Sequence, residues 1–357
     1  GSPLWFKVIG PASCGKSPLC EAISVARKYV FANSTMRGFH SGFKTDRAGK
    51  EDNSLIPKIK DKTLVTKDGD TLLSSPNLSQ ILSEGRDLYD CTARVHYRHG
   101  LSRQYDDVRM SWILCGTESF IKLDSIYFAQ LFFNSVMMQV IDAALEKEIN
   151  PTIIYRTIRN TALQADGTLE SRQEPALQEA RQLTGGYIEY LRQNAGELLA
   201  AVSMSDERAE LCIKLGTFIA YMRARPSKRQ DENVSREFSG RLVEQIAKMS
   251  IHLAAVLGKV SVDEEVIRRV RKIAFATARG KTLEIAEHLY KAGDDGVSLS
   301  ALSIYTGETE DRDRKLLQFL RKLGVVELWQ KSPTGFSRFR WRLAKRMRDL
   351  WKEVMHA

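Results

Sequence analysis

The chain has 357 residues, 43% of them hydrophobic and 27% charged, and is long enough for two or three domains with cores of their own. No apolar run approaches the ~20 residues of a membrane-spanning helix, so we expect no membrane partner and a cytoplasmic, nucleoid-associated protein. The net charge of +10 favours a polyanionic partner, most often nucleic acid.

Five cysteines are scattered along the chain without a metal-ligand spacing. They are Cys14, Cys20, Cys91, Cys115 and Cys212. Their odd number and irregular spacing favour a reducing compartment and no disulfide framework.

The segment VIGPASCGKSPLC, residues 8–20, contains the pattern Gly-x-x-x-x-Gly-Lys-Ser. Glycines let backbone N–H groups point at phosphate oxygens, a lysine reaches the β- and γ-phosphates, and a hydroxyl binds Mg²⁺. The flanks agree with this interpretation, because residues 4–9 predict a strand and residues 17–30 predict the helix that comes next. The alternative is a chance run of small residues. We predict an ATP- and Mg²⁺-binding loop, with Ser17 on the metal, that consists of Gly10, Pro11, Ala12, Ser13, Cys14, Gly15, Lys16 and Ser17.

A nucleoside triphosphatase also needs an acid near Mg²⁺ and a group that orients the attacking water. In KTLVTKDGDTLL (62–73), Leu64 and Val65 predict a strand, and two acids come at its end. Asp68 is the candidate metal-side carboxylate, and Asp70 is the candidate base. The alternative is a plain acidic turn, because Asp-Gly is a common turn dipeptide.

Residues 93–110, ARVHYRHGLSRQYDDVRM, predict a basic hairpin with Gly100 at its tip. Arg98, His99 and Arg103 flank that tip, so the hairpin is a candidate for sequence-independent contact with a DNA phosphate backbone.

The next predicted strand lies within VRMSWILCGTES, residues 108–119. It is apolar through Trp112 to Cys115 and stops at Thr117. A polar side chain at this place is suited to sense a γ-phosphate or to position water. The alternative is a simple cap of the strand.

From about residue 140 to 275 the sequence is predicted to be almost entirely helical. Residues 236–258 carry apolar side chains at three- and four-residue steps and end at Gly258, which suits the position after a helix. These side chains are Phe238, Leu242, Ile246, Met249, Leu253 and Val256. Two polar stretches, 164–180 and 223–235, are predicted to be loops or connectors.

Residues 280–345 predict three helices and a hairpin, which is the layout of a winged helix. In such modules the third helix enters the major groove and the wing touches the DNA backbone. Basic residues gather between 336 and 348, and we expect Arg338 and Arg340 to contact DNA. The alternative is a protein-contact module or a solvated basic helix.

The order of these segments resembles that of AAA+ ATPases of phages and mobile elements, which are related to the minichromosome-maintenance (MCM) replicative helicases. The resemblance runs from SLIPKIKDKTLVTKD through ILSEGRDLYD and the hairpin to ILCGTES and FAQLFF, and continues in FIAYMRARP and SREFSGRLVEQIAKMSIHLAAVLGKVSVDEEV. It covers nearly the whole chain. It implies an α/β P-loop NTPase with an AAA+ core (3–140), a helical insertion and lid (141–275) and a C-terminal winged-helix domain (276–357).

The resemblance also implies roles for single residues. These are ATP and Mg²⁺ binding by Lys16 and Ser17, metal binding by Asp68, the sensor-1 place for Thr117 and the sensor-2 place for Arg241. Residues 94–106 become a hairpin that lines the pore of a ring and touches DNA.

One place departs from the family pattern. The family has a Gly-Glu-Arg-Phe or Ser-Arg-Phe run whose arginine reaches the neighbouring subunit's γ-phosphate, whereas residues 129–132 are Ala-Gln-Leu-Phe, with Leu131 in the arginine place. An arginine supplied in this way is worth about 10³–10⁵ in hydrolysis rate in known GTPases. Arg156 or Arg159 are candidate substitutes, and Asp70 stands where glutamate is usual.

These observations predict an ATP-dependent, ring-forming DNA helicase or translocase for mobile-element replication. Its partners would be single-stranded or forked DNA and further copies of the chain, in a hexamer. The first alternative is a scaffold that binds ATP and DNA with little hydrolysis. The others are a DNA-binding regulator or defence factor that reads sequence through the winged helix, and a small-molecule kinase.

Overall fold

The computed structural model divides the chain into two compact units, residues 1–120 with 137–198 and residues 121–136 with 199–357. It describes residues 3–12, 14–16, 19–20, 23, 27–31, 54–73, 78–96, 102–119, 133–138, 170–224, 226, 238–330 and 339–356. Each unit has its own buried core.

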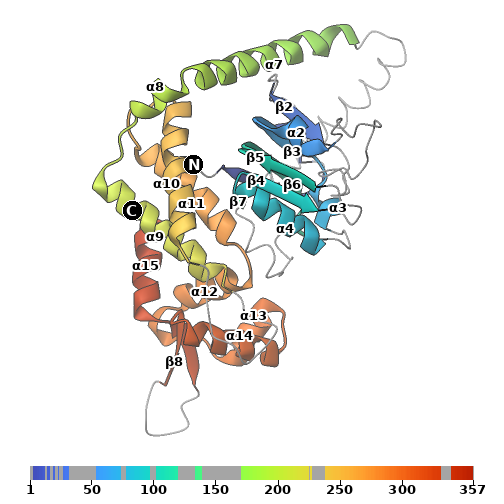
Figure 1. Ribbon diagram of the computed structural model, residues 1–357. Coiled ribbons are helices and arrows are strands. Elements are labelled where there is room, and N and C mark those ends of the chain that lie inside the picture. Colours follow the sequence, from blue (N-terminus) through green and yellow to red (C-terminus); the bar gives the residue numbers. More distant parts are fainter. Residues whose placement is uncertain are drawn as a thin grey trace. The chain divides into compact units, whose positions relative to one another are not determined.

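The first unit is an α/β structure built on a parallel sheet (Figure 1). Its strands are β1 (Trp5–Ile9), β2 (Lys28–Phe31), β3 (Lys62–Thr66) and β6 (Met110–Gly116). They lie in the order β2-β3-β6-β1, so that β6 separates β1 from β3. Pairing along β6 joins Ile9 to Gly116 on one side and Thr66 to Leu114 on the other. All these strands run in one direction, and their carboxyl ends therefore meet at one edge.

Aromatic side chains pack this sheet against α4 (Leu78–Tyr89), the helix that ends at Tyr89. Trp5 makes edge-to-face contacts with Tyr89 and Trp112, each at a ring-centroid distance of 5.3 Å. The Trp5 Nε1–H donates to the carbonyl of Met110 at 3.0 Å, and the Trp112 Nε1–H donates to the Thr66 hydroxyl at 3.0 Å. The polar atoms of both buried indoles are therefore satisfied inside the core.

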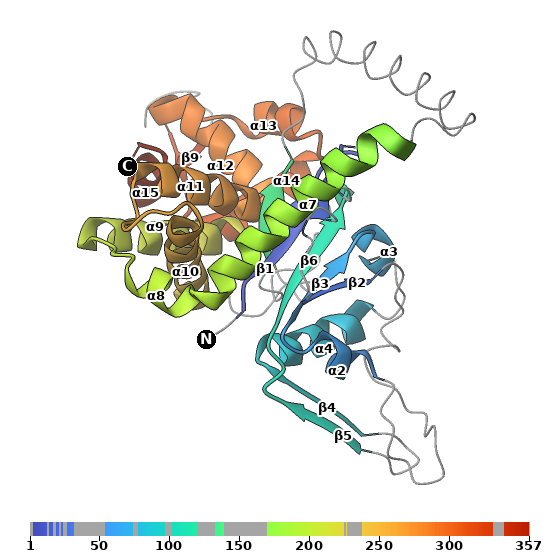
Figure 2. The same ribbon diagram turned by 90° about the horizontal axis from the view of Figure 1, so that it is seen from above.

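Short helices and a hairpin complete the described part of the first unit. The helices are α2 (Leu55–Ile59), α3 (Gly69–Leu73), α4 (Leu78–Tyr89) and the long α7 (Glu170–Gln193), and the hairpin consists of β4 (Thr92–His96) and β5 (Ser102–Asp106). Figure 2 shows the hairpin reaching beyond the sheet, close to α2 and α4. At its base, the Tyr105 hydroxyl donates to the fully buried Ser54 hydroxyl at 2.9 Å, which ties the hairpin to the start of α2.

Two predicted elements were wrong. The helix predicted over 17–30 does not reach its end, because Lys28–Phe31 is a strand paired with β3. Tyr, Val and Phe favour strands, and the open edge of β3 gives them a partner. The polar stretch 164–180, predicted to be a loop, is helical from Glu170 onward. Its Glu, Gln, Ala and Arg are good helix formers despite their polarity.

The second unit is mainly helical, as predicted. It contains α9 (Asp206–Met222), α10 (Gly240–Val256), α11 (Glu264–Ala278), α12 (Lys281–Ala292), α13 (Leu299–Thr306), α14 (Glu310–Lys322) and α15 (Lys345–His356), with strands β8 (Val326–Trp329) and β9 (Arg340–Leu343). β7 (Phe133–Met137) and α8 (Ala195–Ala200) fall at the division between the units. In Figure 1, α9, α10, α11 and α15 form one group, and α12–α14 with β8 form another.

An aromatic cluster joins the two groups. Phe218 on α9 contacts Phe275 on α11 at a ring-centroid distance of 4.8 Å and Trp351 on α15 at 5.3 Å. Trp351 also stacks on Tyr290 of α12 at 5.2 Å. The C-terminal helix α15 therefore packs against residues from three other helices.

The predicted apolar face of α10 is confirmed in its middle but not at its ends. Leu242, Ile246 and Met249 are buried, whereas Phe238, which precedes the helix, is 84% exposed and Val256 is 44% exposed. The predicted end of the helix is confirmed, because Gly258 has φ = +67°, a conformation that glycine adopts without strain.

The predicted C-terminal order of three helices and a hairpin is also confirmed, as α12, α13, α14, β8 and β9. Val297, between α12 and α13, exchanges two backbone hydrogen bonds of 2.8 Å with Trp341 on β9. This bridge adds a third extended segment to the hairpin. Among the helices that the structure describes, none is both long and apolar enough to cross a membrane.

We predict that Gly216→Ala on α9 lowers the free energy of unfolding by about 1–3 kcal/mol, because a core that gains a methyl group it cannot accommodate is strained. The new Cβ would lie 2.6 Å from Val243 Cγ2 and 2.7 Å from the Val243 backbone nitrogen on α10. Urea unfolding measures the change. The control is Gly186→Ala on α7, where nothing lies within 4 Å. There the better helix propensity of alanine should raise stability by about 0.5–1 kcal/mol, and an equal loss for both variants would contradict the prediction.

Candidate nucleotide-binding site

The predicted phosphate-binding loop begins where β1 ends, at the carboxyl edge of the sheet. The Gly10 backbone N–H donates to the carbonyl of Gly116 on β6 at 3.2 Å. A Cβ on Gly10 would lie 2.7 Å from Cys14 Sγ and 2.9 Å from Met138 Cβ, so this position leaves no room for a side chain. Gly15 has φ = +87°, which favours glycine. The local structure therefore explains why glycine stands at both positions: Gly10 has no room for a side chain, and Gly15 has a positive φ.

Lys16 folds back over the loop. Its Nζ donates to the carbonyls of Gly10 at 2.8 Å and Pro11 at 2.5 Å, and lies 3.6 Å from Cys14 Sγ. Lys16 and Leu19 are helical, and the Leu19 N–H donates to the Gly15 carbonyl at 3.1 Å. An ammonium group at the mouth of a glycine-containing turn, directly before a helix, fits an anionic phosphate by charge and by geometry.

Asp70 and Thr117 meet at the same edge of the sheet. The Thr117 N–H donates to Asp70 Oδ2 at 2.9 Å, and the Thr117 hydroxyl donates to Asp70 Oδ1 at 3.2 Å. Thr117 is the next residue after Gly116, whose carbonyl is bonded to Gly10. The candidate sensor therefore lies between the loop and the candidate base, as the position of β6 between β1 and β3 requires.

Ser119 belongs to the same cluster, although the sequence pattern had indicated Thr117 alone. The Ser119 hydroxyl donates to Asp70 Oδ1 and lies 2.8 Å from the Thr117 hydroxyl. Asp70 therefore accepts from both Thr117 and Ser119 and uses both of its oxygens. The polar run Thr117-Glu118-Ser119 after an apolar strand is the signal that could have indicated this residue.

Asp68 has a different environment. Its Oδ2 accepts from the Thr71 hydroxyl at 2.6 Å and its Oδ1 from the Thr71 N–H at 3.4 Å. Asp68 is exposed and acts as a cap for α3, which begins at Gly69. Its oxygens are of the type that Mg²⁺ prefers. Within the described ranges, no group of three or more His, Cys, Asp or Glu side chains is placed to hold a metal ion.

A pair of thiols lies beneath the loop. Cys20 and Cys115 are buried with their sulfur atoms 3.4 Å apart, and they pack with Val8 and Val65. The hydrogen bond with Cys20, together with burial, raises the pKa of the Cys115 thiol above its usual range. Cys115 is therefore a protonated packing group of the core.

The hairpin presents one face to solvent and the other inward. Arg94 and His96 lie on the exposed face, whereas Arg103 pairs with Val95 on the less exposed face and has its Nε and Nη2 atoms buried. The Arg94 side chain is 63% exposed, with Asp106 at 3.8 Å. The face that could meet a phosphate backbone therefore carries Arg94, which lies within the predicted DNA-contacting range 94–106 but was not named individually.

The remaining predicted residues fall in other places. Arg241 lies at the N-terminal turn of α10 in the second unit and is exposed. The other predicted residues lie outside the described residues, namely Ser13, Ser17, Arg98, His99, Leu131, Arg156, Arg159 and Arg338.

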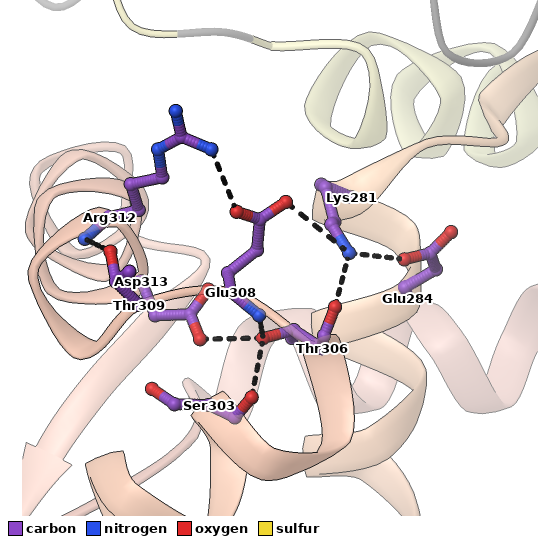
Figure 3. Close-up of polar contacts among 8 residues, drawn as sticks. All are labelled: Lys281, Glu284, Ser303, Thr306, Glu308, Thr309, Arg312 and Asp313. Carbon is purple, nitrogen blue, oxygen red and sulfur yellow. Dashed lines mark hydrogen bonds and ion pairs between the residues drawn. The ribbon is translucent and has the colours of Figure 1, made fainter.

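A polar network fixes the turn between α13 and α14 in the second unit (Figure 3). Lys281 on α12 donates to the carbonyl of Thr306 at 2.7 Å. It also lies 3.5 Å from Glu284 and 3.9 Å from Glu308. The Thr306 hydroxyl donates to the buried Asp313 at 2.7 Å. These bonds set the orientation of α14, the third helix of the C-terminal group.

Many basic groups of this region already have acidic or carbonyl partners. Arg340 Nη1 donates to the carbonyls of Asp295 at 3.3 Å and Gly296 at 3.4 Å. On α14 the pairs are Arg312 with Glu308 at 3.1 Å, Arg314 with Glu310 at 3.8 Å and Lys315 with Asp311 at 2.8 Å. The acids of the first turn lower the positive charge that this end of α14 presents.

No family model matches the chain, and no curated protein matches its sequence.

We predict that Asp70→Ala lowers the free energy of unfolding by about 1–3 kcal/mol, because it leaves the donors of Thr117 and Ser119 without their acceptor. Asp68→Ala removes an exposed cap and should cost at most about 1 kcal/mol. Urea unfolding compares the two variants. If Asp68→Ala lowered the free energy of unfolding more than Asp70→Ala, the hydrogen bonds described for these two acids could not explain their contributions to stability.

Proposed function

We propose that the chain is an ATP-dependent DNA motor of the MCM-like AAA+ type, a ring-forming helicase or translocase. The observation that carries the proposal is that the loop with Lys16 and the bonded pair of Thr117 and Asp70 follow the carboxyl ends of neighbouring strands of one parallel sheet. It combines a loop suited to phosphate, a polar group at the end of the middle strand and an acid beside it. Phosphoryl transfer depends on such positioning and electrostatic stabilisation.

Each of the chain's own residues at this edge would have a separate task. Lys16 would exchange the carbonyls of Gly10 and Pro11 for phosphate oxygens. Asp68 and the predicted Ser17 would bind the Mg²⁺ that accompanies ATP and neutralises its charge. Thr117 would contact the terminal phosphate, and Asp70 would orient water.

The hairpin and the C-terminal group support a DNA partner. The hairpin precedes β6 in the chain and joins it at its amino end, whereas Asp70 and Thr117 follow the carboxyl ends of β3 and β6. Its exposed face carries Arg94. The three helices and hairpin of residues 281–343 agree with a winged helix, and the charge of +10 agrees with a polyanionic partner.

A second candidate function is an ATP-binding scaffold on DNA with little hydrolysis. The observation that favours it is that both candidate acids have local partners, Asp68 with Thr71 and Asp70 with Thr117 and Ser119. Leu131, which stands in the place of the family's arginine, also favours slow hydrolysis. Tight binding of Mg·ATP with negligible turnover on DNA would select this function.

Lys16→Ala should weaken Mg·ATP binding at least about tenfold, because hydrogen bonds to charged groups are worth roughly 1.5–3 kcal/mol. Isothermal titration calorimetry measures the dissociation constant. Lys60→Ala, which removes an exposed lysine after α2, is the control and should bind as the wild type does. Wild-type affinity in the Lys16 variant would count against a phosphate-binding loop.

Arg94→Ala should weaken the binding of single-stranded DNA and reduce the slope of log K against log salt by about 0.7, the value for one phosphate contact. Fluorescence anisotropy across a salt series measures both quantities. The control is Arg109→Ala, which removes an exposed arginine bound to Asp107 outside the hairpin strands. Equal slopes in the wild type and the Arg94 variant would show that this face does not contact DNA.

A further inference from the structure

The two strands of the hairpin leave the rest of the first unit through residues in the left-handed conformation. Cys91, directly before β4, has φ = +61°, and Asp107, directly after β5, has φ = +55°. They flank the first pair of the hairpin ladder, Thr92 with Asp106, so the two bends lie opposite each other. The left-handed region is unfavourable for residues with a Cβ and is adopted readily by glycine, so the backbone is strained at both positions.

Hydrogen bonds hold both bends in place. The Val108 N–H donates to the carbonyl of Cys91 at 2.8 Å, which joins the exit of the hairpin to its entry. The Cys91 N–H donates to the carbonyl of Leu88, near the end of α4, at 3.1 Å. The Arg109 N–H and Nε donate to the carbonyl and the carboxylate of Asp107, at 3.1 Å and 2.7 Å. Because Val108 and Leu88 are buried, these bonds tie the base of the hairpin to the core.

We propose that Cys91 and Asp107 are positioning residues, which fix the direction in which the exposed face of the hairpin presents Arg94 to a nucleic-acid backbone. The inference rests on the proposed function and deepens it. A residue with a Cβ in the left-handed region has few other conformations within reach, since steric clashes exclude most of the φ/ψ space around it. The hairpin therefore meets its ligand already oriented, and binding loses less conformational entropy.

Glycine at either position separates stability from binding. It removes the strain, so the folded chain becomes more stable, but it also frees the backbone at the base of the hairpin. Binding must then order that backbone, and the affinity for nucleic acid falls. A residue with a purely structural role would change both quantities in the same direction. Because Arg94 still reaches its phosphate in the complex, the slope of log K against log salt stays as in the wild type.

Thermal unfolding and fluorescence anisotropy with single-stranded DNA, both on the full chain, test the proposal. Asp107→Gly is compared with Asp107→Asn, which removes the same charge, and Cys91→Gly with Cys91→Ala, which removes the same thiol. We expect each glycine variant to melt roughly 1–4 °C higher than its comparison variant, and to bind DNA about 2- to 5-fold more weakly at an unchanged salt slope.

Asp61 provides the matched control. It is also left-handed, with φ = +57°, but lies directly before β3, outside the hairpin. Asp61→Gly should therefore raise the melting temperature relative to Asp61→Asn in the same way, because it relieves the same kind of strain. It should leave the affinity for DNA unchanged, because it frees no backbone at the base of the hairpin.

The outcomes separate this proposal from the proposed function. A wild type that does not bind single-stranded DNA would refute the nucleic-acid surface, and this inference with it. A wild type that binds, with equal affinities within each pair of variants at residues 91 and 107, would refute the positioning role alone. A loss of affinity of the same size in Asp61→Gly, or a lower melting temperature in the glycine variants of the hairpin, would also refute it.

Discussion

The position of β6 between β1 and β3 is the constraint on which the rest of the first unit depends. Parallel pairing aligns Ile9 with Gly116 and Thr66 with Leu114, so the three strands end at nearly the same level. The segments after these strands differ in chemistry: a glycine-containing loop with a lysine, a pair of acids, and a pair of hydroxyls. The middle position of β6 brings the hydroxyls between the lysine and the acids.

The charged groups at this edge have partners within the chain. Lys16 contacts backbone carbonyls, Asp68 caps its own helix, and Asp70 accepts from Thr117 and Ser119. Binding of a nucleotide would therefore exchange hydrogen bonds and not merely add them. The net gain per exchanged bond is small compared with its gross strength, so the geometry of each donor decides how much affinity results.

The sequence predicted the elements whose signals are local. Apolar runs predicted β1, β3 and β6, and Gly258 predicted the end of α10, because periodicity and positive φ need no distant partner. Lys28–Phe31 was missed because its strand depends on the edge of β3. The contact of Ser119 with Asp70 spans 49 residues, and the inward side of Arg103 depends on its register with Val95. The Ser119–Asp70 contact and the inward orientation of Arg103 both depend on how strands pair in space, which a local sequence pattern does not reveal.

Hydrogen–deuterium exchange of the full chain, with and without Mg·ATP, tests the central claim most directly. If the loop and the end of β6 form one triphosphate site, the nucleotide should protect peptides that cover residues 10–20 and 110–119 together, while exchange in the hairpin of β8 and β9 stays unchanged. Protection confined to peptides of the second unit, or unchanged exchange in both segments at saturating nucleotide, would contradict the account.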